Sequence, residues 1–168
     1  MAAHILVAYS TRKGSTAEIA LAIAKELEKA GGAAVTVSDL TSVSSVADYN
    51  AIVIGAPVYT GKISGDVAAF ARRHRVSLGR VPVAGFVTGI APVYPKTGDI
   101  SAFTRQLEDA LDPVRLVAVT MFAGRLDAAR LSFIERGMTS LLKVPTGDFR
   151  DWGTIAAWAR ELPGKMGI

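Results

Sequence analysis

The stretch Ser10–Thr16 combines hydroxyl side chains with one glycine, a composition suited to holding a phosphate group. It follows the apolar run Ile5–Ala8 and leads into a helical pattern, so it is predicted to join a strand to a helix. Free backbone amides and the positive end of the helix dipole favour an anion there. Gly14 would let the backbone approach the anion closely. Hydroxyl donors would come from Ser10, Thr11, Ser15 and Thr16.

The same loop lacks the spacing of the commonest nucleotide-binding motifs. It matches neither the GxxxxGK(S/T) pattern of a Walker loop nor the dinucleotide pattern GxGxxG. A receiver domain would need an acidic pair in place of Tyr9 and Ser10 and an aspartate in place of Gly55. A low-molecular-weight phosphatase would need a cysteine. The alternative is an ordinary polar turn beside a capped helix, since Ser15–Glu18 fits a capping box that would start the helix at about Thr16.

Composition argues against several classes of site and partner. The 168 residues contain no cysteine and only two histidines, which excludes disulfides and thiolate centres and argues against a histidine-rich metal site. The formal charge is +4, but no basic stretch interleaved with aromatic residues indicates nucleic acid. The length fits one domain over residues 1–168, with no signal peptide and no apolar run near the roughly 20 residues that cross a bilayer. We therefore expect a cytoplasmic protein, and peripheral contact with the inner face of a membrane stays open.

Five short apolar runs predict the strands of a parallel sheet. They are Ile5–Ala8, Ala34–Val37, Ile52–Ile54, Val83–Val87 and Leu116–Val119. Four are continuous, as expected of strands covered on both faces, whereas Ala34–Val37 alternates, which favours a place near the sheet edge. Helical stripes lie between them over Ala20–Leu27, Val67–Ala71 and Phe103–Leu111, the first ended by Gly31 and Gly32 and the third by Pro113. The alternation predicts a doubly wound, three-layer α/β domain, whose ligands bind at the carboxyl ends of the strands.

The end of the chain is predicted to form a helix over Trp152–Leu162, closed by Pro163 and Gly164. Asp148 or Asp151 would cap its first turn. Both tryptophans of the chain, Trp152 and Trp158, would pack on the sheet. We expect these residues to be structural and not to take part in chemistry.

Four segments of the chain resemble the flavodoxin superfamily. Thr11–Thr16 matches its FMN-phosphate loop, Ser/Thr-x-Thr-Gly-x-Thr, at all but one fixed position, with Lys13 where a third threonine is usual. Tyr9–Thr16 is most similar to the branch that contains the menaquinone-dependent protoporphyrinogen dehydrogenases. Similarity to that branch continues in Val53–Lys62, Phe122–Asp127 and Thr146–Trp152. The resemblance covers essentially the whole chain and implies a flavodoxin-like fold: a five-stranded parallel sheet of order 2-1-3-4-5 with helices on both faces.

The resemblance implies that FMN is the cofactor and that its phosphate is held by Ser10–Thr16. Its isoalloxazine ring would reach the loops after the third and fourth strands. Tyr59 would stack on the ring, Gly61 would provide a flexible peptide near the flavin N5, and Lys62 would place a cation near the pyrimidine edge. The candidate cofactor-binding residues are Ser10, Thr11, Arg12, Lys13, Gly14, Ser15, Thr16, Pro57, Val58, Tyr59, Thr60, Gly61, Lys62, Thr88, Gly89, Ile90, Ala91 and Tyr94.

The loop after the fourth run, Thr88–Gly98, is long and rich in proline and glycine, which is typical of a functional or mobile loop. Thr88–Ala91 would supply backbone donors to the polar edge of the flavin, and Tyr94 would stack or form a substrate lid. The alternative is that Tyr59, Lys62 and Tyr94 are ordinary turn residues. In that case Pro92 and Pro95 would simply stiffen the loop.

One departure from the branch is expected. Its protoporphyrinogen-oxidising members carry a longer, basic insertion in the last third of the chain. Here we expect Leu116–Val119 to pass through a short turn at Phe122–Asp127 into a helix over 127–144, with no room for a large insertion. That helix carries basic residues around a wide apolar face, which leaves contact with an anionic membrane open.

The resemblance predicts an FMN-dependent oxidoreductase that moves electrons between a reduced substrate, such as protoporphyrinogen IX, and a quinone-type acceptor. No pair of side chains indicates acid–base catalysis, so the chemistry would lie on the flavin and no catalytic residue is named. Two alternatives are a flavodoxin-type electron carrier with another redox partner and a flavin-free interaction scaffold. The basic composition favours partners different from those of strongly acidic flavodoxins.

Overall fold

A computed structural model describes residues 3–10, 14–126, 137 and 146–168. Within these residues, five parallel strands form the main sheet in the order β2-β1-β3-β5-β6. They are β1 (His4–Tyr9), β2 (Ala34–Asp39), β3 (Ala51–Tyr59), β5 (Val83–Gly89) and β6 (Leu116–Ala123). Counted among themselves, these strands have the order 2-1-3-4-5, which confirms the predicted topology. A short strand, β4 (Lys62–Ile63), pairs antiparallel with the end of β3.

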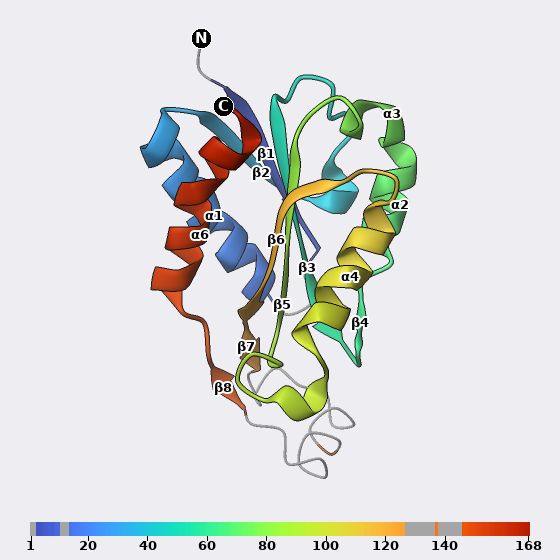
Figure 1. Cartoon of the computed structure of the whole chain (residues 1–168), viewed down its shortest axis with the longest axis vertical. Helices are drawn as coiled ribbons and strands as arrows, with labels where there is room; N and C mark the ends of the chain where they lie inside the picture. Colours follow the sequence, from blue (N-terminus) through green and yellow to red (C-terminus); the bar gives the residue numbers. More distant parts are fainter. Residues whose placement is uncertain (1–2, 11–13, 127–136, 138–145) are drawn as a thin grey trace.

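Helices cover both faces of the sheet (Figure 1). On one face lie α1 (Ser15–Gly31) and α6 (Trp152–Met166), and on the other lie α2 (Asp66–Arg73), α3 (Arg75–Leu78) and α4 (Ile100–Leu111). Neighbouring residues of a strand point to opposite faces. Accordingly, Ile5 and Val7 belong to the core layer under α1 and α6, whereas Leu6 and Ala8 belong to the layer under α2 and α4. Burial on both faces explains the continuous apolar runs.

The two outer strands are less covered than the central ones. β2 has no fully buried residue, which confirms its predicted place at the edge, and a short 3-10 turn (Leu40–Ser42) follows it. β6 forms the opposite edge, where Val117 is 42% exposed and none of Leu116–Val119 is fully buried. The prediction of cover on both faces is wrong for this run, because the flanking helices leave part of an outermost strand open.

The helix ends partly follow the predicted signals. α1 ends at Gly31, and Gly32 adopts φ 62, the left-handed conformation that the glycine pair predicts. α6 does not stop at Leu162: it continues through Pro163 to Met166. Leu162 and Met166 are both buried, so the apolar contact of one further turn offsets the hydrogen bond that proline cannot donate. Asp151 caps α6 as predicted, accepting from the Thr154 amide at 3.0 Å.

The chain after β6 differs from the predicted short turn into a helix. Arg125–Leu126 forms a strand, β7, that pairs antiparallel with β8 (Gly147–Asp148). The pairing places Leu126 and Gly147 side by side, and the expectation that no room exists for a large insertion stays a prediction. The predicted turn residue Asp127 and most of the predicted helix over 127–144 lie outside the described residues.

Of the two tryptophans, one packs on the sheet. The Trp158 ring meets the rings of Phe122 and Phe86 edge-on, at centroid distances of 5.5 and 6.2 Å. Trp152 is 43% exposed, so its predicted packing on the sheet is wrong. It stands at the first position of α6, and the Arg150 guanidinium lies 4.7 Å above its ring. A cation covers this ring instead of the apolar core.

Candidate functional site

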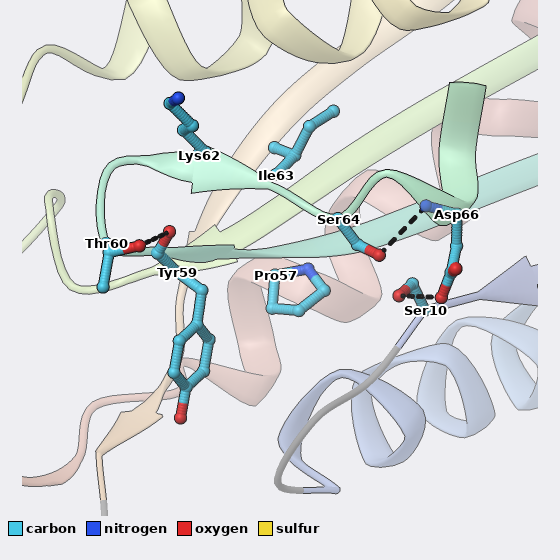
Figure 2. A pocket seen from close by; sticks show the side chains of 8 residues that line it. All are labelled: Ser10, Pro57, Tyr59, Thr60, Lys62, Ile63, Ser64 and Asp66. Atoms are coloured by element: carbon cyan, nitrogen blue, oxygen red, sulfur yellow. Dashed lines mark hydrogen bonds between the residues drawn. The ribbon is translucent and has the colours of Figure 1, made fainter. Parts of the chain in front are cut away.

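A hollow of about 420 Å³ opens where the carboxyl ends of β1 and β3 meet (Figure 2). The lining residues are Ser10, Pro57, Tyr59, Thr60, Lys62, Ile63, Ser64 and Asp66. In Figure 2 the lining runs from the Tyr59 ring at one end, past Pro57, to Ser10 and Asp66 at the other. Strand order reverses between β1 and β3, and ligands of doubly wound sheets bind at such a point. Ser10, at the end of β1, and Tyr59, at the end of β3, thus line the same hollow.

A two-residue turn at Thr60 and Gly61 folds β3 back onto β4. The two residues adopt φ values of 48° and 80°, and the flanking Tyr59 and Lys62 form a cross-strand pair. Positive φ at both central positions defines a type I′ turn, whose twist suits a hairpin. Thr60 is the exception to the usual preference for glycine or asparagine, and its hydroxyl donates to the Tyr59 carbonyl at 2.7 Å. The turn holds Tyr59 and Thr60 at the rim of the hollow.

Gln106 of α4 joins this hairpin to the body of the protein. Its Nε2 donates to the Gly61 carbonyl at 2.9 Å, and its Oε1 accepts from the Ile63 amide at 3.1 Å. One side-chain amide thus satisfies two backbone groups on either side of Lys62. The sequence reasoning missed this residue, since nothing in the apolar stripe of α4 marks it.

The predicted phosphate loop is described at its two ends. Ser10 is 4% exposed; its amide donates to the Gly55 carbonyl at 2.9 Å and its hydroxyl to Asp66 Oδ2 at 3.4 Å. Gly14 adopts φ 85 and is the N-cap of α1, with no side-chain cap. The predicted capping box is therefore wrong: the Ser15 hydroxyl instead accepts from the Arg125 amide at 3.3 Å. Thr11, Arg12 and Lys13 lie outside the described residues.

The end of β5 is joined by a hydrogen bond to the first turn of α1. The buried hydroxyls of Thr16 and Thr88 lie 2.9 Å apart, so these two predicted donors bond to each other. The Gly124 amide donates to the Gly89 carbonyl at 2.9 Å, and the Ile90 carbonyl accepts from the Tyr94 amide at 2.7 Å.

The rest of the loop after β5 contains a 3-10 turn, Pro95–Thr97. That this loop is functional or mobile stays a prediction. Ala91 is 2% exposed and belongs to the core, against which Val58 also packs. Neither Thr88–Ala91, Val58 nor Tyr94 lines the hollow, and their contact with a cofactor stays a prediction.

Charged side chains gather beside the N-terminus of α1. Arg150, with only 4% of its side chain exposed, binds Asp148 through two nitrogens at 2.7 and 2.8 Å and Glu18 at 2.8 Å. The hydrogen bonds from Arg150 lower the pKa of Asp148 to about 2, and those to Asp148 and Glu18 raise the pKa of Arg150. One terminal nitrogen of Arg125 lies 3.9 Å from Glu18 and is buried without a hydrogen bond. Two guanidinium groups thus lie beside the first turn of α1.

The lining also contains residues that the sequence reasoning did not select: Ile63, Ser64 and Asp66. A local signal existed for the last two. A serine two positions before an aspartate favours a local turn, in which the Ser64 hydroxyl accepts from the Asp66 amide at 3.1 Å. This turn comes just before α2, whose N-cap is Gly65 without a side-chain cap, and it gives no sign that Asp66 reaches Ser10.

Two kinds of feature are absent from the described part of the chain. No group of three or more histidine, aspartate or glutamate side chains that could hold a metal ion lies within it. Among the described helices, none has the length and apolar character needed to cross a membrane.

The fold and its sequence are similar to known proteins. Residues 6–152 match the model of the flavodoxin domain family. Protoporphyrinogen IX dehydrogenase [quinone] of Escherichia coli K12 is 26% identical over 175 residues, covering 94% of this chain and 93% of that protein. A protein of the same name from Leishmania major is also 26% identical, over 94% of this chain and 73% of that protein.

Solved structures show the same fold at low sequence identity. A Fusobacterium nucleatum flavodoxin variant bound to flavin mononucleotide superposes with a TM-score of 0.57 at 13% identity, covering 99% of this chain and 96% of that one. Rubredoxin oxygen:oxidoreductase of Desulfovibrio gigas gives a TM-score of 0.60 at 14% identity, and this chain spans 37% of its length. Because the family model covers most of the sequence and the strand order agrees with it, the chain belongs to the flavodoxin domain family.

Proposed function

We propose that this protein binds FMN and passes electrons from a reduced substrate to a quinone-type acceptor. The observation that carries the proposal is the hollow at the strand reversal, bounded by Tyr59 at one end and by Ser10, close to the N-terminus of α1, at the other. An aromatic side chain can stack on a flat ring system. A helix N-terminus offers free amides that bind a phosphate. The hollow's size also falls within the roughly 300–1,000 Å³ of ordinary small-molecule sites.

The residues present fit a flavin nucleotide, each in a distinct role. Gly14, with its left-handed backbone, would let the phosphate approach the first amides of α1. The Ser10 hydroxyl, which donates to Asp66, would turn its one proton to the phosphate instead, and the Tyr59 ring would cover one side of the isoalloxazine. The Asp66 carboxylate would repel the phosphate. Its place in the cofactor site would therefore be beside the ribityl chain, from whose hydroxyls it would accept hydrogen bonds. Arg125 and Arg150 lie beside the same helix start, but Glu18 and Asp148 balance their charge, so the first amides of α1 would do most to hold the phosphate.

FMN, when bound, supplies the redox chemistry. The chain's contribution would be to hold the ring, to exclude water from the face covered by Tyr59 and to leave the other face to the substrate. The ionisable side chains in the lining are Tyr59, Lys62 and Asp66. Lys62 is exposed on β4, where its cation would favour a negatively charged reduced ring.

For the substrate we propose a reduced tetrapyrrole, with protoporphyrinogen IX as the specific candidate. The support is the shared name of two relatives that match 94% of this chain. Each pair of electrons and protons removed from the tetrapyrrole would leave with the quinone, which becomes a quinol. The protein would accordingly work where quinones are available, in the cytoplasm or at the inner face of a membrane.

The first experiment is the visible spectrum of the purified protein with and without added FMN. We expect a bound-flavin spectrum that bleaches with protoporphyrinogen IX under anaerobic conditions and recovers with a menaquinone analogue. If the spectrum of FMN changes on binding but the bound flavin does not respond to the tetrapyrrole or the quinone, the result would favour an electron carrier. If added FMN stays unperturbed at micromolar protein, the oxidoreductase proposal fails and a flavin-free scaffold replaces it.

A further inference from the structure

Arg150 is a charged side chain that is almost fully enclosed, with 4% of it exposed. Its Nε and Nη2 donate to the two carboxylate oxygens of Asp148 at 2.8 and 2.7 Å, and its Nη1 donates to Glu18 Oε2 at 2.8 Å. The guanidinium also lies 4.7 Å from the centre of the Trp152 ring. Because one edge and one face of the planar group are occupied, the direction of Nη1 toward Glu18 is fixed.

The end of the sheet holds the segment that carries Arg150. The Phe149 amide donates to the Gly124 carbonyl at 3.1 Å, and the Gly124 amide donates to the Gly89 carbonyl, at the end of β5, at 2.9 Å. Just before Phe149, β8 pairs with β7. Backbone contacts thus run from the sheet to the residue next to Arg150, which makes its guanidinium a fixed support for whatever it binds.

Glu18, which Arg150 binds, belongs to the first turn of α1, where its amide donates to the Gly14 carbonyl at 3.2 Å. The N-cap Gly14 has no side chain that could cap this turn, so contacts from other elements hold it. The buried Thr16 hydroxyl bonds to that of Thr88. Glu18 lies about 200° further round the helix than Thr16, so Arg150 holds the opposite side of the turn.

One further contact reaches the same side of the turn as Glu18. Ser15, about 60° from Glu18 around the helix, accepts from the Arg125 amide at 3.3 Å. This bond joins neutral groups and is longer than the ionic bond from Arg150, so it is the weaker of the two. The Arg125 guanidinium lies 3.9 Å from Glu18, beyond hydrogen-bond distance. Loss of the Arg150 bond should therefore let the turn tilt about its buried side, which redirects its first amides.

We propose that Arg150 is a positioning residue that, through Glu18, directs the first amides of α1 at the phosphate and so makes the protein select FMN over riboflavin, which lacks the phosphate. The inference rests on the proposed FMN binding. Asp148 and Glu18 balance the charge of Arg150, so its contribution is the direction of neutral N–H groups. The same pairing engages the Glu18 carboxylate, which would otherwise repel the phosphate more strongly.

Two substitutions of Glu18 isolate the bond to Arg150. The Glu18 side chain is 46% exposed, so its replacement should leave folding intact. Glu18→Gln removes the charge and keeps an oxygen that can accept from Arg150, whereas Glu18→Ala removes both. Because the two variants have the same net charge, a difference between them reports the bond and not the repulsion of the phosphate. Each variant is titrated with FMN and with riboflavin, and flavin fluorescence gives the two affinities.

FMN affinity is expected to be about 10-fold lower in Glu18→Ala than in Glu18→Gln, with equal riboflavin affinity in the two. Arg150→Met keeps an unbranched side chain and is expected to lose at least about 10-fold in FMN affinity relative to wild type, with riboflavin again unchanged. Arg160→Met is the matched control. Arg160 also joins α6 to α1, through Glu26 at 3.3 Å, but at an exposed position, so both affinities should equal those of wild type.

The ratio of the two affinities separates positioning from stability. A merely structural role of Arg150 would weaken FMN and riboflavin alike, because a loosened fold holds the ring less well too. Equal ratios in Glu18→Ala and Glu18→Gln overturn the inference and leave the proposed function standing. Wild-type protein that binds riboflavin as tightly as FMN also overturns the inference alone. Wild-type protein that binds neither flavin overturns both.

Discussion

The two ends of the hollow are built from different physical interactions. At the Tyr59 end, neutral hydrogen bonds from Gln106 hold a tight hairpin. At the Ser10 end, charged side chains surround the start of α1, with Arg150 almost fully buried between Asp148 and Glu18. The Gln106 amide fixes the direction of the hairpin without adding charge, whereas the charged end, where two guanidinium groups face two carboxylates, responds to salt and pH. The difference suits a ligand with an uncharged ring and a phosphate.

The largest effect is expected at the charged end, from Gly14→Val. A β-branched residue is a strong outlier at φ 85, so the first turn of α1 must move away from the phosphate position. FMN affinity, measured by quenching of flavin fluorescence, is expected to fall at least about 100-fold.

Gly31→Ala is its matched control, because this residue ends the same helix and an added Cβ would meet nothing within 4 Å. Wild-type affinity in Gly14→Val would show that the phosphate is held elsewhere.

At the neutral end, Tyr59→Ala is expected to weaken FMN binding by about 10-fold, since loss of a stacked ring costs about 1–2 kcal/mol. Tyr59→Phe keeps the ring and is expected to bind as tightly as wild type. Titration of apo protein with FMN at low and high salt would also test the comparison. The loss caused by Tyr59→Ala should be the same at both salt concentrations, because ring stacking carries no net charge, and a salt-dependent loss would contradict this contact.

Asp148→Asn tests the charge network itself. Asp148 is about half-exposed, so its pair with Arg150 is expected to contribute about 1 kcal/mol or less to stability. Its pKa of about 2 lies below the ordinary 3.8, so the contribution is present above pH 4 and is lost as pH falls toward 2. Urea unfolding at pH 6 should separate the variant from wild type, and at pH 2 the two curves should come together. A gap that persists at pH 2 would mean that Asp148 acts through packing.

A smaller effect is expected at a region remote from both ends, where α2 passes into α3. His74 is buried against the Phe70 ring, and this burial together with Arg73 lowers its pKa below 6.5, partly opposed by a hydrogen bond with the Val43 backbone. Folding then favours the neutral ring, so stability is complete above pH 6.5 and falls below it. The urea midpoint of wild type is expected to decline from pH 7.5 to 5.5 more than that of His74→Leu. Parallel curves would assign the decline to other groups.

Local patterns were sufficient to predict most of the fold. The runs around Ile5–Ala8 and Val83–Val87 predict central strands, because burial on both faces leaves no polar alternation. The glycine pair predicts the end of α1, since Gly32 adopts a conformation that other residues avoid. That residues 1–168 form a single domain stays a prediction.

The candidate site could be predicted only where its contacts are local. Ser10 and Tyr59 follow predicted strands, so topology alone brings them to one hollow. The capping box failed because Ser15 bonds to the Arg125 amide, 110 residues away, which no window of sequence reveals. Gln106 and Arg150 were missed for the same reason. The partners of Gln106 lie 43 and 45 residues away in the sequence. Of the two partners of Arg150, Asp148 is close in sequence but Glu18 lies 132 residues away.

The pairing of β7 with β8 also matters for how this fold can diversify. Because Arg125–Leu126 lies beside Gly147–Asp148, the chain between them begins and ends at one point. A loop whose ends are already held together tolerates changes of length cheaply, with each doubling costing only about 0.6 kcal/mol. Changes in the length of the segment between β7 and β8 are therefore expected to leave the sheet and the hollow as they are. The ribbon offers protein engineers a fusion point at which a reporter or an anchor can be inserted.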